Sequence, residues 1–139
     1  MTTLDRLSAL GLAAETELRD GILPFWATRA VDVGQGCVVQ QGIVLAVEAI
    51  EGTDAMLTRA RTLRRPGAGG VLVKLVKPGQ ERRADLPTVG PGTIRAGVAA
   101  GLRGVAFEAG GTILTDREAT VAAADAAGVF LLGVDPNER

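Results

Sequence analysis

The chain has 139 residues, of which 47% are hydrophobic and only 3% aromatic, and its formal net charge at pH 7 is −1. This length suits one domain with a single core, and the scarcity of aromatic side chains favours α/β layers built from Val, Leu, Ile and Ala. Because no basic run is combined with aromatic residues that could stack on bases, nucleic acid is not expected as a partner.

Hydrophobic periodicity divides the chain into helices and strands. An amphipathic helix is expected over 4–19, and the aromatic pair Phe25 and Trp26 then fits either one end of the core or a surface that docks another domain. The elements expected after this pair are hairpin strands at Cys37–Gln40 and Ile43–Ala49, a helix over 53–63, a strand over 71–76, an irregular loop over 77–92, a short helix over 93–100, hairpin strands over 104–108 and 112–114, a helix over 116–127 and a strand over 129–134. Because hairpins alternate with helical crossovers, the predicted fold class is α/β (α+β), a single domain in which helices cover a mixed β-sheet.

Turn and cap residues set the bounds of several of these elements. Gly42 is expected to supply the positive φ of the first hairpin turn, and Gly110-Gly111 forms the turn of the second. Thr53 is predicted to cap the N-terminus of its helix, and Asp116 to cap the last helix, which ends before Gly128.

The histidine and cysteine content excludes several kinds of site. The chain has no histidine and one cysteine, Cys37, so a Ser–His or Cys–His couple, a His-ligated metal and an internal disulfide are all impossible. Acid–base work is left to Asp, Glu, Lys or a metal-bound water. Val38 and Val39 follow the cysteine, which indicates a buried strand thiol. With no signal peptide and no run of about 18 apolar residues, a cytoplasmic protein is expected, for which contact with a membrane surface stays open.

Three acids lie in one strand-to-helix turn, V-E-A-I-E-G-T-D, namely Glu48, Glu51 and Asp54. Gly52 lets the backbone approach a ligand, and the N-terminus of the following helix offers N–H groups, so the turn suits a phosphate or a hydrated divalent cation. The alternative is that Thr53 and Asp54 only cap the helix while the glutamates face solvent.

Basic residues concentrate in the middle of the chain. Lys74 interrupts an apolar strand, and eight of the fifteen basic residues lie between 59 and 83, which indicates an anionic ligand. The alternative is that Lys74 reaches solvent at a sheet edge and the helical arginines form a solvated face.

Asp85 stands after Arg82-Arg83 and before L-P-T-V-G-P-G. Held by Pro87 and beside cations, its carboxylate would be well placed to hold Mg²⁺ or orient a water; a turn before proline explains it equally well. No G-x-G-x-x-G follows a strand and opens a helix, so a dinucleotide cofactor is not supported.

Several motifs stand in one order along the chain: D-V-G-Q from Asp32, L-A-V-E-A-I-E-G-T-D-A-M-L from Leu45, G-G-V-L-V-K from Gly69, K-P-G-Q from Lys77, D-L-P-T-V-G-P from Asp85, E-A-G-G-T from Glu108 and A-A-D-A-A-G-V-F from Ala123. In these motifs the chain resembles the C-terminal domain of the LpxI-type UDP-2,3-diacylglucosamine pyrophosphatases of lipid A biosynthesis. The resemblance runs from about Asp32 to about Val134, which predicts an N-terminal helix and linker over 1–31 and the catalytic domain over 32–139.

The resemblance implies a reaction and a site. In that family Mg²⁺-dependent hydrolysis cleaves the pyrophosphate of UDP-2,3-diacylglucosamine, with water attacking the α-phosphorus to give UMP and 2,3-diacylglucosamine 1-phosphate (lipid X). The catalytic aspartate falls on Asp85, and Asp85 and Asp54 are the expected metal ligands. The resemblance and the charge pattern together predict the residues that contact the substrate and its phosphates. These are Glu51, Gly52, Thr53, Lys74, Lys77, Gln80, Arg83 and Thr88.

The family's two-domain plan implies a partner for this chain. Full members carry an N-terminal domain, with the active site between the two domains, and the resemblance covers only the C-terminal one. The expected partners are therefore an N-terminal domain, the substrate or lipid X, and a second copy in a homodimer. The alternative is a non-catalytic module that binds an acylated sugar phosphate or serves dimerisation.

Overall fold

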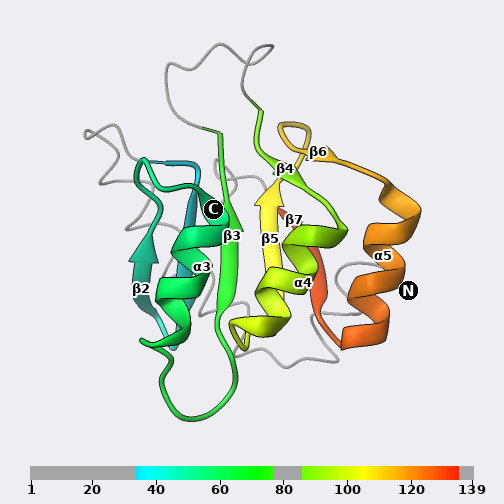
Figure 1. The fold of residues 1–139 in the computed structure, drawn as a ribbon. Helices are drawn as coiled ribbons and strands as arrows, with labels where there is room; N and C mark the ends of the chain where they lie inside the picture. The colour runs from blue at the N-terminus through cyan, green and yellow to red at the C-terminus, as the bar shows by residue number, and fades with distance from the viewer. Residues whose placement is uncertain (1–33, 77–85, 135–139) are drawn as a thin grey trace.

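The computed structural model describes residues 34–76 and 86–134, which form a mixed sheet and three helices (Figure 1). In chain order the elements are β1 (Gly36–Gln40), β2 (Ile43–Val47), α3 (Thr53–Arg61), β3 (Val71–Lys74), β4 (Thr88–Val89), α4 (Pro91–Ala99), β5 (Gly104–Glu108), β6 (Ile113–Leu114), α5 (Arg117–Ala127) and β7 (Phe130–Val134). The predicted helix over 4–19, the pair Phe25 and Trp26 and the segment 77–85 lie outside the described residues.

The main sheet has five strands in the order β2-β1-β3-β5-β7. Strand β1 is antiparallel to β2 and to β3, whereas β3, β5 and β7 are parallel. Strand β2 therefore points the same way as β3, β5 and β7, and only β1 runs against them. The predicted mixed sheet is confirmed, and the helices α3, α4 and α5 lie side by side on one of its faces (Figure 1).

Strand residues alternate between the two faces of the sheet, as the pleat requires. On the helix-covered face Val38, Leu72 and Val105 pack against Met56, Leu57, Ile94 and Ala124. On the other face Cys37, Val39, Val73, Ala106 and Phe130 form a second buried cluster, to which the described helices contribute nothing. Cys37 is fully buried on β1, which confirms the predicted strand thiol.

Local turn and cap chemistry explains the elements that were predicted well. The first hairpin turns at Gln41 and Gly42 with φ of 55° and 74°, and such two-residue turns commonly need a positive φ at both central positions. Asp116 caps α5 by accepting a hydrogen bond from the Ala119 N–H at 3.3 Å, and Gly128 ends that helix with a φ of 69°.

Two predicted helix starts are corrected. Gly52, not Thr53, is the N-cap of α3, because the Thr53 hydroxyl donates to Glu48 and makes no cap hydrogen bond. Helix α4 begins at Pro91, two residues before the predicted start, since proline is favoured in the first helical turn.

The second predicted hairpin is also wrong. The turn with positive φ at Gly110 exists, but β6 does not pair with β5 across it. Both edges of β5 are already occupied by β3 and β7, so β6 pairs in parallel with β4 instead. The pairing sets Thr88 opposite Ile113 and joins the segment before α4 to the segment before α5.

Candidate functional site

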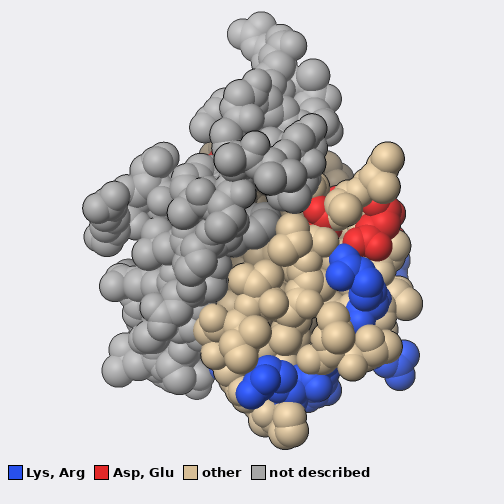
Figure 2. Space-filling view, turned by 90° about the vertical axis from the view of Figure 1, so that its left-hand side faces the viewer, with Lys and Arg blue, Asp and Glu red and all other residues tan. Residues whose placement is uncertain are grey.

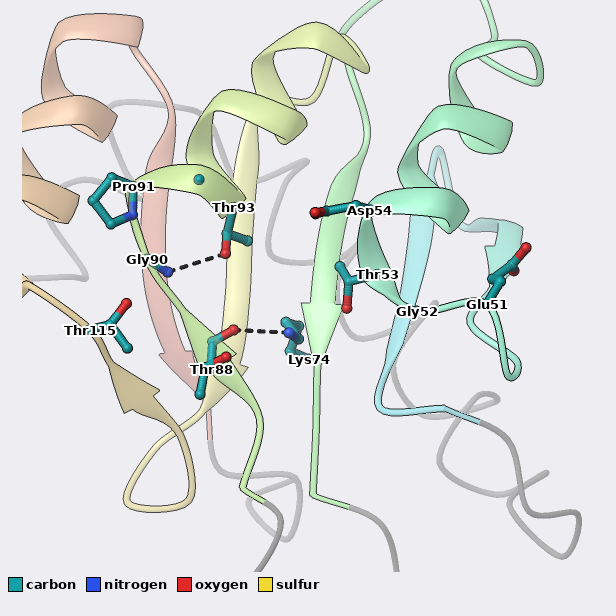
Figure 3. Close-up of a pocket in the computed structure, with 11 residues that line it drawn as sticks. Glu51, Gly52, Thr53, Asp54, Lys74, Thr88, Gly90, Pro91, Thr93 and Thr115 are labelled. Atoms are coloured by element: carbon teal, nitrogen blue, oxygen red, sulfur yellow. Dashed lines mark hydrogen bonds between the residues drawn. The ribbon is translucent and has the colours of Figure 1, made fainter.

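A pocket of about 520 Å³ lies at the carboxyl end of strand β3, between the starts of α3 and α4 (Figure 3). Its lining comes from four separate segments: Glu51, Gly52, Thr53, Asp54, Lys74, Thr88, Gly90, Pro91, Gly92, Thr93 and Thr115. The topology explains this convergence. Because β2, β3 and β5 point the same way, the helices that follow them all begin at one end of the sheet, where α/β folds usually bind ligands.

Helix N-termini make this end of the sheet attractive to anions. The first N–H groups of a helix have no partner within the helix and carry the positive end of its dipole. At α4 the Gly90 N–H donates to the Thr93 hydroxyl at 3.1 Å, which fixes the chain where it enters the helix. Two such N-termini, of α3 and α4, border one pocket, an arrangement that suits phosphate groups.

Lys74 supplies a cation between the two helices. It ends β3 with only 6% of its surface exposed, and its ammonium group donates to the Thr88 carbonyl oxygen at 2.9 Å. Burial lowers the pKa of Lys74, and the negative charges of Glu48 and Asp54 act in the opposite direction. This lysine does not reach solvent at a sheet edge, because β3 is the central strand.

The two acids of the pocket face different ways. The Glu51 carboxylate forms an ion pair with the Arg59 guanidinium at 2.5 Å, and that guanidinium also donates to the Val47 carbonyl oxygen at 3.0 Å. In Figure 3 Glu51 points away from Lys74, whereas Asp54 points from α3 toward α4. Asp54 is thus the carboxylate directed across the pocket.

Most of the described arginines lie away from this pocket. Arg65 follows α3 at the other end of the sheet, where its Nε donates to the Gln41 side chain at 3.2 Å, and Arg64 lies against Gly101. Figure 2 shows the same separation on the side formed by β2 and α3, with acidic residues gathered toward the upper end and basic ones mainly below. Among the described basic residues, Lys74 is the one that lines the pocket.

The predicted site residues are therefore placed in two groups. Glu51, Gly52, Thr53, Asp54, Lys74 and Thr88 come together at the pocket, and Lys77, Gln80, Arg83 and Asp85 lie outside the described residues. Sequence reasoning missed the pocket residues Gly90, Pro91, Gly92, Thr93 and Thr115. The G-P-G-T run did carry a signal, since proline after a glycine commonly opens a helix, but nothing in the sequence marks Thr115.

The donor atoms of the described part of the pocket fit Mg²⁺ only in part. No group of three or more Asp, Glu or Cys side chains within residues 34–76 and 86–134 could hold a metal ion. Mg²⁺ is, however, usually held by one or two carboxylates while waters and substrate phosphates complete its shell. Asp54 offers one such carboxylate, so the described part of the pocket supplies one of the ligands that such a magnesium ion would need.

Comparison with known proteins shows the family to which the chain belongs. The family model described as "LpxI C-terminal domain" matches residues 11–132. A curated protein of Caulobacter vibrioides, UDP-2,3-diacylglucosamine pyrophosphatase LpxI, is 55% identical over 115 residues, which cover 78% of this chain and 41% of that protein. The chain thus spans less than half the length of this relative. By the extent of the family match, the chain belongs to the LpxI C-terminal domain family.

Proposed function

We propose that this chain is the catalytic module of a Mg²⁺-dependent hydrolase that cleaves UDP-2,3-diacylglucosamine to UMP and lipid X. The observation that carries the proposal is one pocket in which two helix N-termini and the buried Lys74 converge. A pyrophosphate is bound by N–H donors and cations, and this pocket offers the first N–H groups of two helices together with Lys74. The name of the Caulobacter relative supports the substrate.

The proposed reaction is a displacement at the α-phosphorus. A water oxygen bonds to this phosphorus and gives up its proton to Asp85, the bond from the phosphorus to the bridging oxygen breaks, and that oxygen leaves with the β-phosphate as part of lipid X. Positioning and neutralisation of charge do most of the work in phosphoryl transfer. Lys74 and the N-termini of α3 and α4 would hold the phosphate oxygens, with Gly52, Thr53 and Thr88 shaping the wall around them.

Asp85 is the proposed catalytic residue and, with Asp54, a proposed magnesium ligand. The ion would neutralise phosphate charge when it is bound. Asp85 stands three residues before Thr88, so the two Cα atoms are separated by at most about 11 Å, and Thr88 lines the pocket. Glu51, Lys77, Gln80 and Arg83 are proposed as further substrate contacts.

The partners follow from the size and chemistry of the proposed substrate. Because the relative is more than twice as long as the matched region, we propose that an N-terminal domain completes the site. Among the described residues no helix is long and apolar enough to cross a membrane. A cytoplasmic site of action with peripheral membrane contact is proposed because the substrate carries two acyl chains. The homodimer stays a prediction.

A product assay tests the function. We would measure Mg²⁺-dependent release of UMP from UDP-2,3-diacylglucosamine by this chain alone and by the chain joined to the N-terminal region of the Caulobacter relative. We expect turnover by the joined protein and a loss of at least about 100-fold in Asp85→Asn, the lower range for removal of an acid–base group. Asp125→Asn, on the exposed side of α5, is the matched control.

Two other results of this assay would contradict the proposal. An unchanged rate in Asp85→Asn would remove the role assigned to this residue. Binding of lipid X without UMP release by either protein would instead support a module that only recognises the acylated sugar phosphate.

A further inference from the structure

Glu48 is held rigidly behind the pocket, although it does not line it. Its backbone continues the pairing of β1 and β2 past the end of β2: the Gly34 N–H donates to the Glu48 carbonyl oxygen at 2.6 Å, and the Glu48 N–H donates to the Gly36 carbonyl oxygen at 2.8 Å. Both backbone hydrogen bonds fix the direction in which the half-buried Glu48 side chain leaves the strand.

The two glycines of G-Q-G make room for this side chain. A Cβ atom on Gly34 would lie 2.5 Å from Glu48 Cγ, and one on Gly36 would lie 2.9 Å from Glu48 Oε2. Neither distance is compatible with ordinary packing. Space for the inner part of the Glu48 side chain therefore explains Gly34, and the carboxylate of Glu48 lies over Gly36 of β1.

The far end of Glu48 reaches the first residue of α3. The Thr53 hydroxyl donates to Glu48 Oε2 at 3.0 Å. Glu48 also interacts electrostatically with the buried Lys74, whose pKa it raises against the effect of burial. Gly36, beneath Glu48, pairs across the strands with Lys74, so the acid stands between a pocket hydroxyl and the pocket cation.

This contact decides what the Thr53 hydroxyl can offer to a ligand. A hydroxyl has one hydrogen and two lone pairs, and a carboxylate can only accept. The hydrogen of Thr53 is therefore committed to Glu48, and only lone pairs remain for the pocket. A phosphate oxygen, which is also an acceptor, gains nothing from this side chain.

We propose that Glu48 is a positioning residue that turns the Thr53 hydroxyl into an acceptor, so that Thr53 selects an O–H donor of the ligand rather than a phosphate oxygen. The proposal rests on the proposed function, and it sharpens the role of Thr53 in that site. The donor is a ribose hydroxyl or a metal-bound water, and the phosphate oxygens are left to Lys74 and the helix N–H groups.

The test measures the ratio of the Kd of Thr53→Val to the Kd with native Thr53, with and without Glu48. By calorimetry on the 139-residue chain, we would compare Thr53→Val with native Thr53, first with Glu48 present and then in Glu48→Ala. Within each background the charge is matched. The probe is inorganic pyrophosphate in EDTA, whose oxygens are nearly all acceptors. We expect Thr53→Val to change its Kd by less than about twofold with Glu48 present, and to weaken binding about fivefold in Glu48→Ala, where the hydroxyl is free to donate.

Two further ligands identify the donor. If it is a ribose hydroxyl, Thr53→Val weakens UMP about fivefold in the native background; if it is a metal-bound water, it weakens magnesium pyrophosphate by about the same factor. A fivefold loss of metal-free pyrophosphate with Glu48 present would overturn the proposal, as would equal ratios in the two backgrounds.

A measurement without ligand keeps this test separate from that of the function. Three-bond couplings to the Thr53 side chain report its rotamer. We expect one rotamer in the native chain and in Glu48→Gln, whose amide oxygen still accepts, and averaging in Glu48→Ala. Averaging in the native chain would overturn the inference. A native chain that held one rotamer but bound no pyrophosphate or UMP, either alone or joined to the N-terminal region of the Caulobacter relative, would count against the proposed function and not against the Glu48–Thr53 contact.

Discussion

At one end of the sheet Lys74 is buried between two helix N-termini. At the other end Arg61, in the last turn of α3, and Arg64 and Arg65, just after it, are exposed. Counted along the sequence, these cations form one basic cluster. In the structure they are separated by the length of β3. Arginines near a helix C-terminus complement the negative end of its dipole, whereas a lysine beside N-termini adds to positive potential. The number of cations thus says less about a ligand than the end of the helix beside which they lie.

Neutral hydrogen bonding holds the arginine end together. The Gln40 side chain is fully buried and donates to the carbonyl oxygens of Arg65 and Ala68 at 2.9 and 2.7 Å. Its own carbonyl oxygen accepts from the Arg65 N–H at 2.8 Å. One uncharged residue thereby fixes the loop between α3 and β3, while the arginine side chains project into solvent.

Replacing Lys74 should have the largest effect on ligand binding. A small effect would contradict the difference between the lysine end and the arginine end of the sheet. We expect Lys74→Met to weaken inorganic pyrophosphate about 10- to 100-fold in calorimetry, because hydrogen bonds to charged groups contribute about 1.5–3 kcal/mol. Arg64→Gln, at the other end, should change the Kd by less than about twofold. Similar losses in both variants would show that the two ends act as one basic surface.

Replacing Gln40 should lower stability and leave binding intact. In Gln40→Ala three hydrogen bonds are lost and backbone groups of the loop between α3 and β3 lose their partner, so we expect the free energy of unfolding to fall by about 2–3 kcal/mol in urea titrations. The folded variant should bind pyrophosphate as the native chain does. Gln41→Asn, in the exposed turn, is the control with a small effect, and an equal loss there would contradict the role given to Gln40.

The smallest effect concerns stability at alkaline pH. Burial lowers the pKa of Lys74 in the folded chain, so between this pKa and the ordinary lysine value the unfolded chain binds more protons. In that window the contribution of Lys74 to the free energy of unfolding should rise with pH. Urea titrations at increasing pH should show a more positive slope for the native chain than for Lys74→Met, and identical slopes would argue against the burial.

Local chemistry explains how much of the molecule was predictable. The hairpin at Gln41-Gly42 and both ends of α5 depend on residues adjacent in sequence, and they were predicted correctly. Pocket residues were predictable where acids cluster in one turn, as at Asp54, or where a charge interrupts an apolar strand, as at Lys74.

Thr115 could not be predicted, because it reaches the pocket only through the strand order. The same holds for the partner of β6. Its choice depends on both edges of β5 being occupied, which is a property of the whole sheet. Thr53 was predicted to be a cap, but its hydroxyl donates to Glu48, whose backbone is held by hydrogen bonds to Gly34 and Gly36.

The short β4–β6 pairing also bears on how the family can change in length. The Ile113 N–H donates to the Pro87 carbonyl oxygen at 2.9 Å, and the Thr115 N–H donates to that of Val89 at 3.0 Å, on either side of the Thr88 carbonyl that receives Lys74. An inserted residue at the exposed turn of Ala109 and Gly110 would leave these bonds in register. One inserted between Ile113 and Thr115 would shift them and displace the partner of the lysine. We therefore expect inserted residues to be tolerated at the turn and to be disruptive between Ile113 and Thr115.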